Sequence, residues 1–287
     1  MRAAVLGSPV GHSLSPVLHA AAYAALGLTW WRYDAIECGE AELPGLLDQC
    51  GPDWAGLSLT MPLKRAVLPL LDRADPLVSE VGGANTVLFA AAQRLGYNTD
   101  VPGMVGALAE RGIAPGQDAG VGPALILGGG ATACAALAAV RELGEREVAV
   151  AVRGPGRAGD LLAAADRLNV TVTLRPFEVA SLAGAALIVS TVPAGVADRF
   201  ASALAGLPEP PRAVFDVVYY PWPTPLANAA TAVGAVLAGG FDLLLHQAAG
   251  QVELMTGRPA PVDEMRAAGL AALLSNPGSG GFGEEGT

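Results

Sequence analysis

The sequence predicts an α/β protein of two domains: an N-terminal domain on a mainly parallel sheet, a second domain of the Rossmann type, and a cleft between them. Apolar runs of strand length alternate with helical segments along most of the chain, which is typical of parallel sheets covered by helices. A glycine turn follows one apolar run near the middle of the chain. The length of 287 residues is enough for two modest domains with buried interiors.

The N-terminal domain is expected to begin with three strands, over residues 2–7, 30–36 and 55–60. Ser15 followed by Pro16 predicts a helix start with the serine as the cap, and this helix runs to Gly27. Further helices are expected over residues 40–47 and from Pro62 onward. Residues 85–89 and 94–97 have the pattern of a hairpin, and residues 98–100 begin a helix that ends near residue 112.

The second domain follows a loop over residues 112–123 that is rich in glycine and proline. Its strands are expected near residues 124–127, 148–152, 170–174, 186–190, 213–217 and 235–238, with helices between them. Two last helices, over residues 241–256 and 262–274, are expected to pack back onto the first domain. We therefore place the first domain at residues 1–104 completed by 240–275, the Rossmann-type domain at 105–239, and a flexible tail at 276–287.

A glycine corner lies between a predicted buried strand and an alanine-rich helix, and it consists of Gly128, Gly129, Gly130, Ala131 and Thr132. The G-x-G-x-x-A spacing is typical of a dinucleotide-binding turn, in which glycines let the backbone approach a pyrophosphate at the positive end of a helix. The same triplet also occurs in plain structural turns. From its place between a strand and a helix, we predict that the corner is a dinucleotide site.

The residue after the next strand bears on the choice between NAD and NADP. About 20 residues past the glycines, where an acid would bind the ribose 2′-hydroxyl, the chain has Arg153, with Arg157 one helical turn further on. A cation suits a 2′-phosphate, and the missing carboxylate does not repel one, so we predict NADP as the cofactor. The alternative is that Arg153 is an ordinary solvated loop residue.

Composition narrows the class of protein. The chain is 52% hydrophobic and 15% charged, as expected of a globular protein, and its formal charge of −10 argues against nucleic acid or an anionic membrane surface as the main partner. Three widely spaced cysteines and three scattered histidines predict a reducing compartment and no metal site. The N-terminus meets Gly7 and Pro9 too early for a signal peptide, and no apolar run approaches a membrane span, so we expect a cytoplasmic protein.

Polar side chains stand at several junctions between a predicted strand and the next helix, where open α/β sheets bind ligands. Ser13 and Ser15 can hold a carboxylate beside a helix N-terminus, although Ser15 alone is better explained as a cap. Lys64 follows a strand, Thr60 and the helix-opening Pro62, and this context singles it out from ordinary surface lysines.

Three further clusters complete the candidate site. Asn85 offers a donor and an acceptor to a hydroxyl-rich ligand, and Asp100 at a helix start is a natural ionic partner for Lys64. Taken alone, the two are explained as a turn residue and a helix cap. Tyr219 after a late strand, and Gln247 on the long helix near the end of the chain, are expected to reach the same pocket across the cleft.

Together these segments resemble the shikimate dehydrogenase family over nearly the whole chain. The segments that match, in the family's order, are HSLSP, LTMPLK, GANT, NTDVPG, LGGGATA, VRGPGRA, STVPAG, DVVYYPWPTPL and GFDLLLHQA. The resemblance implies reversible reduction of 3-dehydroshikimate to shikimate with NADPH, in the pathway to chorismate and the aromatic amino acids. We expect a monomer or homodimer.

The resemblance also implies roles for individual residues. Lys64 would be the catalytic acid and base, assisted by Asp100. The substrate-binding residues would be Ser13, Ser15, Thr60, Lys64, Asn85, Asp100, Tyr219 and Gln247. The cofactor-binding residues would be Gly128, Gly129, Gly130, Ala131, Thr132, Arg153, Arg157, Thr191, Val217, Gly240 and Leu243.

The chain departs from the family pattern at a few positions. Ser58 stands where the family usually has an asparagine before the lysine, and Ala131 replaces the third glycine of the phosphate loop. Arg153 lacks the two polar neighbours that usually accompany it at the 2′-phosphate, and Leu243 replaces the usual methionine near the nicotinamide. Three alternatives are a quinate/shikimate dehydrogenase with relaxed cofactor use, a non-catalytic NADP-binding regulatory paralogue, and another two-domain dehydrogenase such as a methylene-tetrahydrofolate enzyme.

Overall fold

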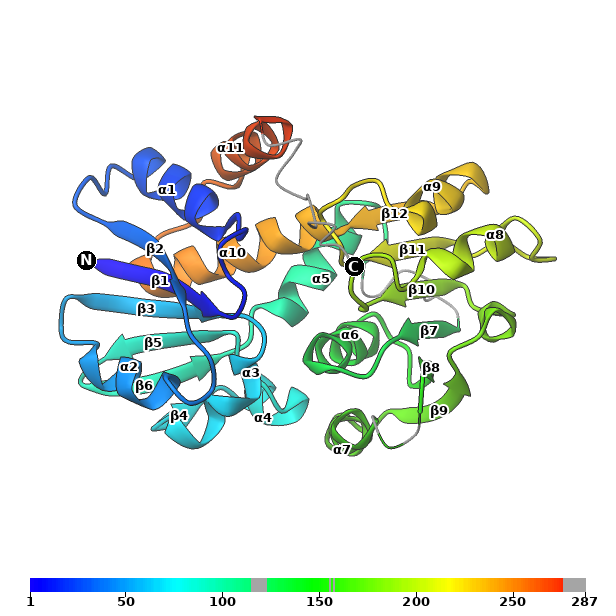
Figure 1. Ribbon diagram of the computed structural model, residues 1–287, viewed down its shortest axis with the longest axis horizontal. Coiled ribbons are helices and arrows are strands. Elements are labelled where there is room, and N and C mark those ends of the chain that lie inside the picture. The colour runs from blue at the N-terminus through cyan, green and yellow to red at the C-terminus, as the bar shows by residue number, and fades with distance from the viewer. Residues whose placement is uncertain (115–122, 155, 157, 276–287) are drawn as a thin grey trace, which may run out of the picture.

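Two six-stranded sheets lie side by side and form the framework of the molecule (Figure 1). The computed structural model describes residues 1–114, 123–154, 156 and 158–275. The N-terminal part of the chain builds the first sheet, and residues 124–239 build the second. The predicted α/β class with mainly parallel sheets is confirmed by this arrangement.

The first sheet consists of β1 (Arg2–Gly7), β2 (Arg32–Glu37), β3 (Trp54–Leu59), β4 (Arg73–Ala74), β5 (Thr86–Ala90) and β6 (Gln93–Tyr97). Their spatial order is β2-β1-β3-β5-β6-β4. β5 runs antiparallel to both of its neighbours, whereas the other strands share one direction. β3 is buried along its whole length, because it lies in the middle of the sheet with an apolar cluster on each face.

Short helices carry the connections of the first sheet: α1 (Ser15–Ala25), α2 (Leu43–Gln49), α3 (Leu63–Ala66), the 3₁₀ helix η1 (Leu68–Leu70) and α4 (Pro76–Val81). The prediction that Ser15 caps the first helix is wrong, because the helix already begins at Ser15, after Leu14. The Ser13 Oγ atom instead accepts a hydrogen bond from the Ser15 backbone N–H, at 3.3 Å. β4 and α4 were not predicted, since elements this short carry too little periodic pattern.

The second sheet consists of β7 (Ala124–Leu127), β8 (Glu147–Val152), β9 (Thr171–Pro176), β10 (Leu187–Ser190), β11 (Ala213–Asp216) and β12 (Val236–Gly239). All of these strands are parallel, and their spatial order is β12-β11-β10-β7-β8-β9. Counted from β7, this is the strand order of the Rossmann fold, with the topological switch point between β7 and β10.

Helices on both faces bury the second sheet, as a parallel sheet requires. They are α6 (Ala131–Glu142), α7 (Gly159–Leu168), the 3₁₀ helices η3 (Val179–Leu182) and η4 (Asp198–Phe200), α8 (Ala201–Leu204) and α9 (Pro225–Ala232). One apolar cluster combines β-strand residues such as Ile126 with Leu137 of α6. The cluster on the other face combines Leu125 with Phe200 and Leu226.

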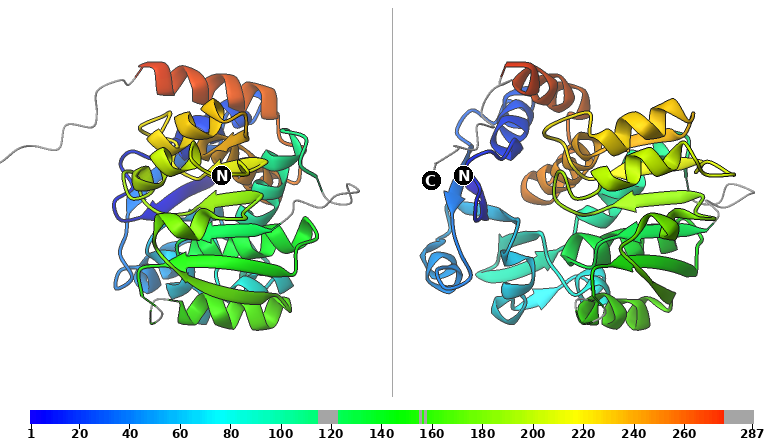
Figure 2. Two further views of the ribbon diagram at one scale, coloured as in Figure 1. Left: turned by 90° about the vertical axis from the view of Figure 1, so that its right-hand side faces the viewer. Right: turned by 45° about the vertical axis from the view of Figure 1, so that its right-hand side comes forward.

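Three further helices lie between or beside the two sheets. α5 (Asp100–Ala109) and α10 (Gly240–Thr256) pack against each other between the sheets (Figure 1). α11 (Val262–Ser275) lies against α1 (Figure 2), and Leu18 of α1 shares a buried cluster with Leu245 of α10 and Met265 of α11. The C-terminal part of the chain therefore packs on the first helix.

The predicted strands agree with the observed ones to within two residues at each end. Most of the predicted linker at residues 112–123 and the whole predicted tail at 276–287 lie outside the described residues. None of the helices in the described part of the chain combines the length and apolar character needed to cross a membrane.

Candidate active site

Lys64 and Asp100 form an ion pair at the carboxyl edge of the first sheet. Lys64 lies on α3, which follows β3, and Asp100 is the first residue of α5, which follows β6. The Lys64 Nζ atom is 2.6 Å from Asp100 Oδ2, and the two side chains are 17% and 7% exposed. Asn98 helps to place the aspartate, because its Oδ1 atom accepts the backbone N–H of Asp100 at 3.0 Å. An ammonium group and its carboxylate counter-ion are thus held together in a partly shielded position.

Asn85 connects this ion pair to residues from two other segments. Its Nδ2 atom donates to Thr99 Oγ1 and to Asp100 Oδ1, each at 2.9 Å, and to Gln247 Oε1 at 3.3 Å. The backbone N–H of Thr99 donates to Asn85 Oδ1 at 2.8 Å. Since a backbone N–H can only donate, this contact determines which amide atom of Asn85 is the oxygen. The structure therefore brings Lys64, Asn85, Asp100 and Gln247 into one hydrogen-bonded cluster.

Ser13, Ser15 and Thr60 lie at the same edge of the sheet, because they follow the parallel strands β1 and β3. The Thr60 methyl group lies close to Gly7 at the end of β1, where a side chain would overlap it. Ser15 is 4% exposed, and Ser13 is half-buried. Among the described residues, none of these three side chains is hydrogen-bonded to Lys64 or Asp100. A substrate role for them stays a prediction.

Tyr219 lies in the segment after β11 and is half-buried. Burial raises the pKa of its hydroxyl, which has no hydrogen-bond partner in the described part of the chain. Asp216, the last residue of β11, holds the start of this segment by accepting Thr224 Oγ1 at 2.8 Å and the Val218 backbone N–H at 3.3 Å. Burial also raises the pKa of Asp216. The structure does not join Tyr219 to the cluster around Asn85.

The glycine corner stands at the carboxyl edge of the second sheet, between β7 and α6. Gly128 has a φ of 116°, and a side chain there would come within 2.6 Å of Thr191 Oγ1. Gly129 is half-buried, whereas Gly130 is exposed and a side chain on it would meet no atom within 4 Å. The N–H groups of the first two residues of α6 have no acceptor within the helix, as at any helix start, and can bind an anion. The corner therefore fits a pyrophosphate.

The other predicted cofactor residues surround the second sheet. Arg153 follows β8, is exposed, and makes no hydrogen bond or ion pair with the residues that the structure describes; Arg157 lies outside them. Gly240 begins α10, and a side chain on it would overlap the Val217 carbonyl group. Leu243 is 9% exposed and belongs to an apolar cluster of the second sheet, so only a small part of its side chain could border a bound cofactor.

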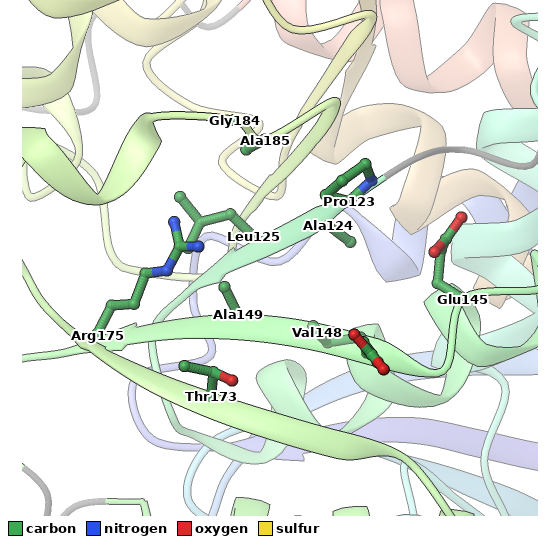
Figure 3. A pocket seen from close by; sticks show the side chains of 11 residues that line it. Pro123, Ala124, Leu125, Glu145, Val148, Ala149, Thr173, Arg175, Gly184 and Ala185 are labelled. Atoms are coloured by element: carbon green, nitrogen blue, oxygen red, sulfur yellow. The ribbon is translucent and has the colours of Figure 1, made fainter.

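A hollow of about 280 Å³ lies at the other end of the second sheet (Figure 3). Its lining includes Ala124 at the start of β7, Glu145, and Arg175 of β9. Because β7 begins at Ala124 and ends just before Gly128, this hollow lies away from the glycine corner. It is not part of the predicted site. In the described ranges no group of three or more His, Cys, Asp or Glu side chains is placed to hold a metal ion.

Several supporting residues were missed in the sequence. Gln251 is 1% exposed and donates to Thr86 Oγ1 at 3.1 Å, next to Asn85. Its only signal was its place four residues after Gln247, which puts both glutamines on one side of a helix. Arg65, beside Lys64, forms an ion pair with Asp160 of α7, and no pattern in the sequence indicates this contact between the two halves.

The fold and the site define an α/β protein with two mainly parallel sheets, a lysine–aspartate pair at the edge of the first sheet and a glycine corner at the edge of the second. A family model described as the shikimate dehydrogenase substrate binding domain matches residues 5–87, and one described as the shikimate 5′-dehydrogenase C-terminal domain matches residues 240–268. A shikimate dehydrogenase (NADP(+)) of Thermus thermophilus is 38% identical over 95% of this chain and 99% of its own. The chain belongs to the shikimate dehydrogenase family, so the resemblance predicted from the sequence is confirmed.

Solved structures agree with this assignment. Mycobacterium tuberculosis shikimate dehydrogenase superposes with a TM-score of 0.83 at 42% identity, covering 94% of this chain and 99% of that one. A Thermus thermophilus shikimate 5-dehydrogenase in complex with NADP(H) and shikimate gives 0.81 at 35% identity, covering 95% and 99%. A quinate dehydrogenase from Corynebacterium glutamicum in complex with NAD gives 0.83 at 28% identity, covering 94% and 99%.

Proposed function

We infer that this protein catalyses the reversible NADPH-dependent reduction of 3-dehydroshikimate to shikimate. The observation that carries the inference is the Lys64–Asp100 ion pair at 2.6 Å, held at the carboxyl edge of the first sheet. Membership of the family, and a relative whose name specifies NADP(+), support the reaction and the cofactor.

In this proposal Lys64 is the acid and base of the reaction. Reduction of a ketone leaves an alkoxide that needs a proton, and the Lys64 ammonium donates it while Asp100 orients the ammonium group. In the reverse direction the amine accepts the proton from the substrate hydroxyl. General acid–base assistance of this kind contributes roughly 10²–10⁴-fold to the rate.

The remaining polar residues are proposed to orient the substrate. The Ser13 and Ser15 hydroxyls, near the start of α1, would hold its carboxylate without a charged partner. The hydroxyl groups of the substrate would contact Thr60, Asn85, Asp100, Tyr219 and Gln247. We accordingly assign substrate binding to residues 1–104 with 240–275, and cofactor binding to residues 105–239.

NADPH, when bound, supplies the hydride. We propose that the glycine corner holds its pyrophosphate, because the exposed face of Gly130 is open and the free N–H groups at the start of α6 suit an anion. Arg153 would bind the 2′-phosphate, and this role is supported because Arg153 forms no ion pair with a carboxylate in the part of the chain that the structure describes. Thr191, Val217, Gly240 and Leu243 would border the rest of the cofactor.

Two alternative functions can be weighed against particular observations. A quinate/shikimate dehydrogenase with relaxed cofactor use is supported by the likeness to the quinate dehydrogenase solved with NAD, and opposed by Arg153. A non-catalytic regulatory paralogue is opposed by the intact Lys64–Asp100 pair.

The test is shikimate-dependent reduction of NADP, measured beside NAD and beside quinate. Turnover with shikimate and NADP, and little with the other pairs, is the expected result. Comparable rates with NAD or quinate would move the protein to the broader quinate/shikimate class. Absence of turnover with every pair would contradict the catalytic proposal and favour the regulatory one.

We further propose that the protein works in the cytoplasm as a monomer or homodimer. Cys38, Cys50 and Cys134 are free thiols, which suits a reducing compartment. Light scattering after gel filtration would distinguish the two oligomeric states.

A further inference from the structure

We propose that Gln251 is a positioning residue for the reaction: it fixes the Asn85 amide and, through it, the Asp100 carboxylate that pairs with Lys64. The inference rests on the proposed function. Gln251 lies on α10, one turn after Gln247, and is 1% exposed. It forms no hydrogen bond with Lys64 or Asp100, so its effect passes through its hydrogen bonds to Thr86 and Asn85.

The direction of each hydrogen bond in this group follows from backbone atoms at its two ends. At one end, the Thr99 N–H requires that Asn85 Oδ1 faces it. At the other, the Asn85 backbone carbonyl can only accept, so the Gln251 atom 3.3 Å away is the Nε2 donor. Gln251 Nε2 also donates to Thr86 Oγ1 at 3.1 Å, and Thr86 Oγ1 then donates its own hydrogen to Asn85 Oδ1 at 2.9 Å.

These assignments leave one orientation for the Asn85 amide. Its Oδ1 atom accepts from Thr86 and Thr99, so its Nδ2 atom must face the other way, toward Asp100 Oδ1 at 2.9 Å. Asp100 Oδ2 remains free to accept the Lys64 ammonium at 2.6 Å. The Thr86 hydroxyl, whose direction Gln251 sets, thus gives Asn85 Oδ1 a second donor beside the Thr99 N–H and restrains the amide that holds the Asp100 carboxylate toward the lysine.

Gln251 is itself fixed from the first sheet. Its Oε1 atom accepts the Ser58 hydroxyl at 2.8 Å, and Ser58 Oγ in turn accepts the Tyr33 hydroxyl at 2.6 Å. Tyr33 stacks on the buried His19 ring, with ring centroids 3.8 Å apart. Ser58 is one of the departures from the family pattern, and here its hydroxyl is the group that meets the glutamine.

The test compares Gln251→Met, which keeps the length of the side chain but removes its polar atoms, with Val252→Ala as a matched control. Val252 is the next residue on α10 and is fully buried, but it packs in the apolar cluster shared with α1 and α11. Its truncation therefore lowers stability without removing any hydrogen bond of Ser58, Thr86 or Asn85. Steady-state kinetics with shikimate and NADP and urea unfolding are measured for both. Each substitution is repeated in the Lys64→Ala background.

We expect Gln251→Met to lower kcat by about 10- to 100-fold, the size of effect that a misplacement below 1 Å produces, with the KM for NADP nearly unchanged. Val252→Ala should leave kcat near that of the wild type. The loss of kcat should disappear in the Lys64→Ala background, because the lysine that Asp100 orients is then absent. A purely structural role would lower stability equally in both backgrounds, and the effect of Gln251→Met on kcat would then not depend on the presence of Lys64.

An unchanged kcat in Gln251→Met, or an equal fall with and without Lys64, would overturn the positioning role. If Gln251→Met does not fold, Ser58→Ala decides in its place, since it removes the donor that holds Gln251 Oε1; kcat should fall in the same direction, and an unchanged value would overturn the proposal. Failure of the wild-type protein to turn over shikimate would instead refute the proposed function.

Discussion

Replacing Lys64 by alanine tests the site most directly, because it removes the proposed proton donor and leaves Asp100 in place. The expected loss in kcat is about 10²–10⁴-fold, which corresponds to roughly 3–5 kcal/mol of transition-state stabilisation. The KM for shikimate should change little, because the other residues that we propose to bind it, among them Asn85 and Gln247, remain in place. Initial rates of NADP reduction over a range of shikimate concentrations measure both quantities.

The same substitution should also change stability by a predictable amount. Breaking a fully buried ion pair lowers the free energy of unfolding by about 3–5 kcal/mol, whereas exposed pairs contribute below about 1 kcal/mol. Side-chain exposures of 17% and 7% place the Lys64–Asp100 pair between these limits, so we expect a loss of about 2 kcal/mol. Adding Asp100→Asn to Lys64→Ala removes the unpaired carboxylate and should restore part of that stability, but none of the activity.

Two results would refute this reasoning. A kcat of Lys64→Ala within about tenfold of the wild-type value would mean that the lysine is not the acid and base of the reaction. An Asp100→Asn, Lys64→Ala double variant no more stable than Lys64→Ala in urea unfolding would mean that the carboxylate is not left unpaired when the lysine is removed.

Three further predictions concern other parts of the molecule. Gly240→Ala should lower the free energy of unfolding by about 1–3 kcal/mol and raise the KM for NADPH, because the new side chain overlaps the Val217 carbonyl; unfolding in urea at the wild-type midpoint would contradict this. Arg153→Asp should raise the KM for NADPH selectively, and an NADPH KM that barely moves would show that Arg153 does not bind the 2′-phosphate. Burial lowers the pKa of His19 to about 4, so the folded protein keeps the ring neutral while the unfolded chain takes up a proton below about pH 6.5. The free energy of unfolding should therefore fall by about 2 kcal/mol from pH 7 to pH 5, and this fall should be absent in His19→Phe. If urea unfolding shows the same dependence of the free energy of unfolding on pH in both proteins, His19 is not its cause.

The strands were predictable because the buried parallel strands of both sheets are continuous apolar runs bounded by glycine, proline or polar residues. β7, β10 and β11 are buried along their whole lengths, and each appears in the sequence as such a run. β4 has two residues and lies exposed at the edge of the first sheet, so no apolar pattern marked it. The error at Ser15 has a similar origin: a serine before a proline is compatible with a cap and equally with the first helical turn, where backbone N–H groups are free.

The Lys64–Asp100 pair was predictable from the sequence because both residues follow strands that end at one edge of the sheet. The supporting bonds were not, since they depend on which side of α10 faces β3 and β5. Gln251 could equally have pointed to solvent, and Ser58 carried no sign that its hydroxyl would meet a glutamine 193 positions away. Asn98, rather than Asp100, provides the capping oxygen of α5, a choice that only the backbone geometry decides.

Two glycines explain how a helix from the end of the chain completes a site that begins at Lys64. Glycine inside a helix is about 1 kcal/mol less favourable than alanine, so Gly103 and Gly106 weaken α5 as an isolated element. A side chain at Gly103 would come within 3.0 Å of the Gln247 backbone nitrogen, and one at Gly106 within 3.0 Å of the His246 ring. Neither glycine has a positive φ, so what they provide is close approach of α5 and α10 and not a turn. That approach brings Gln247 to Asn85 and Gln251 to Thr86, and the intrinsic weakness of α5 is therefore a consequence of building the site where two helices cross.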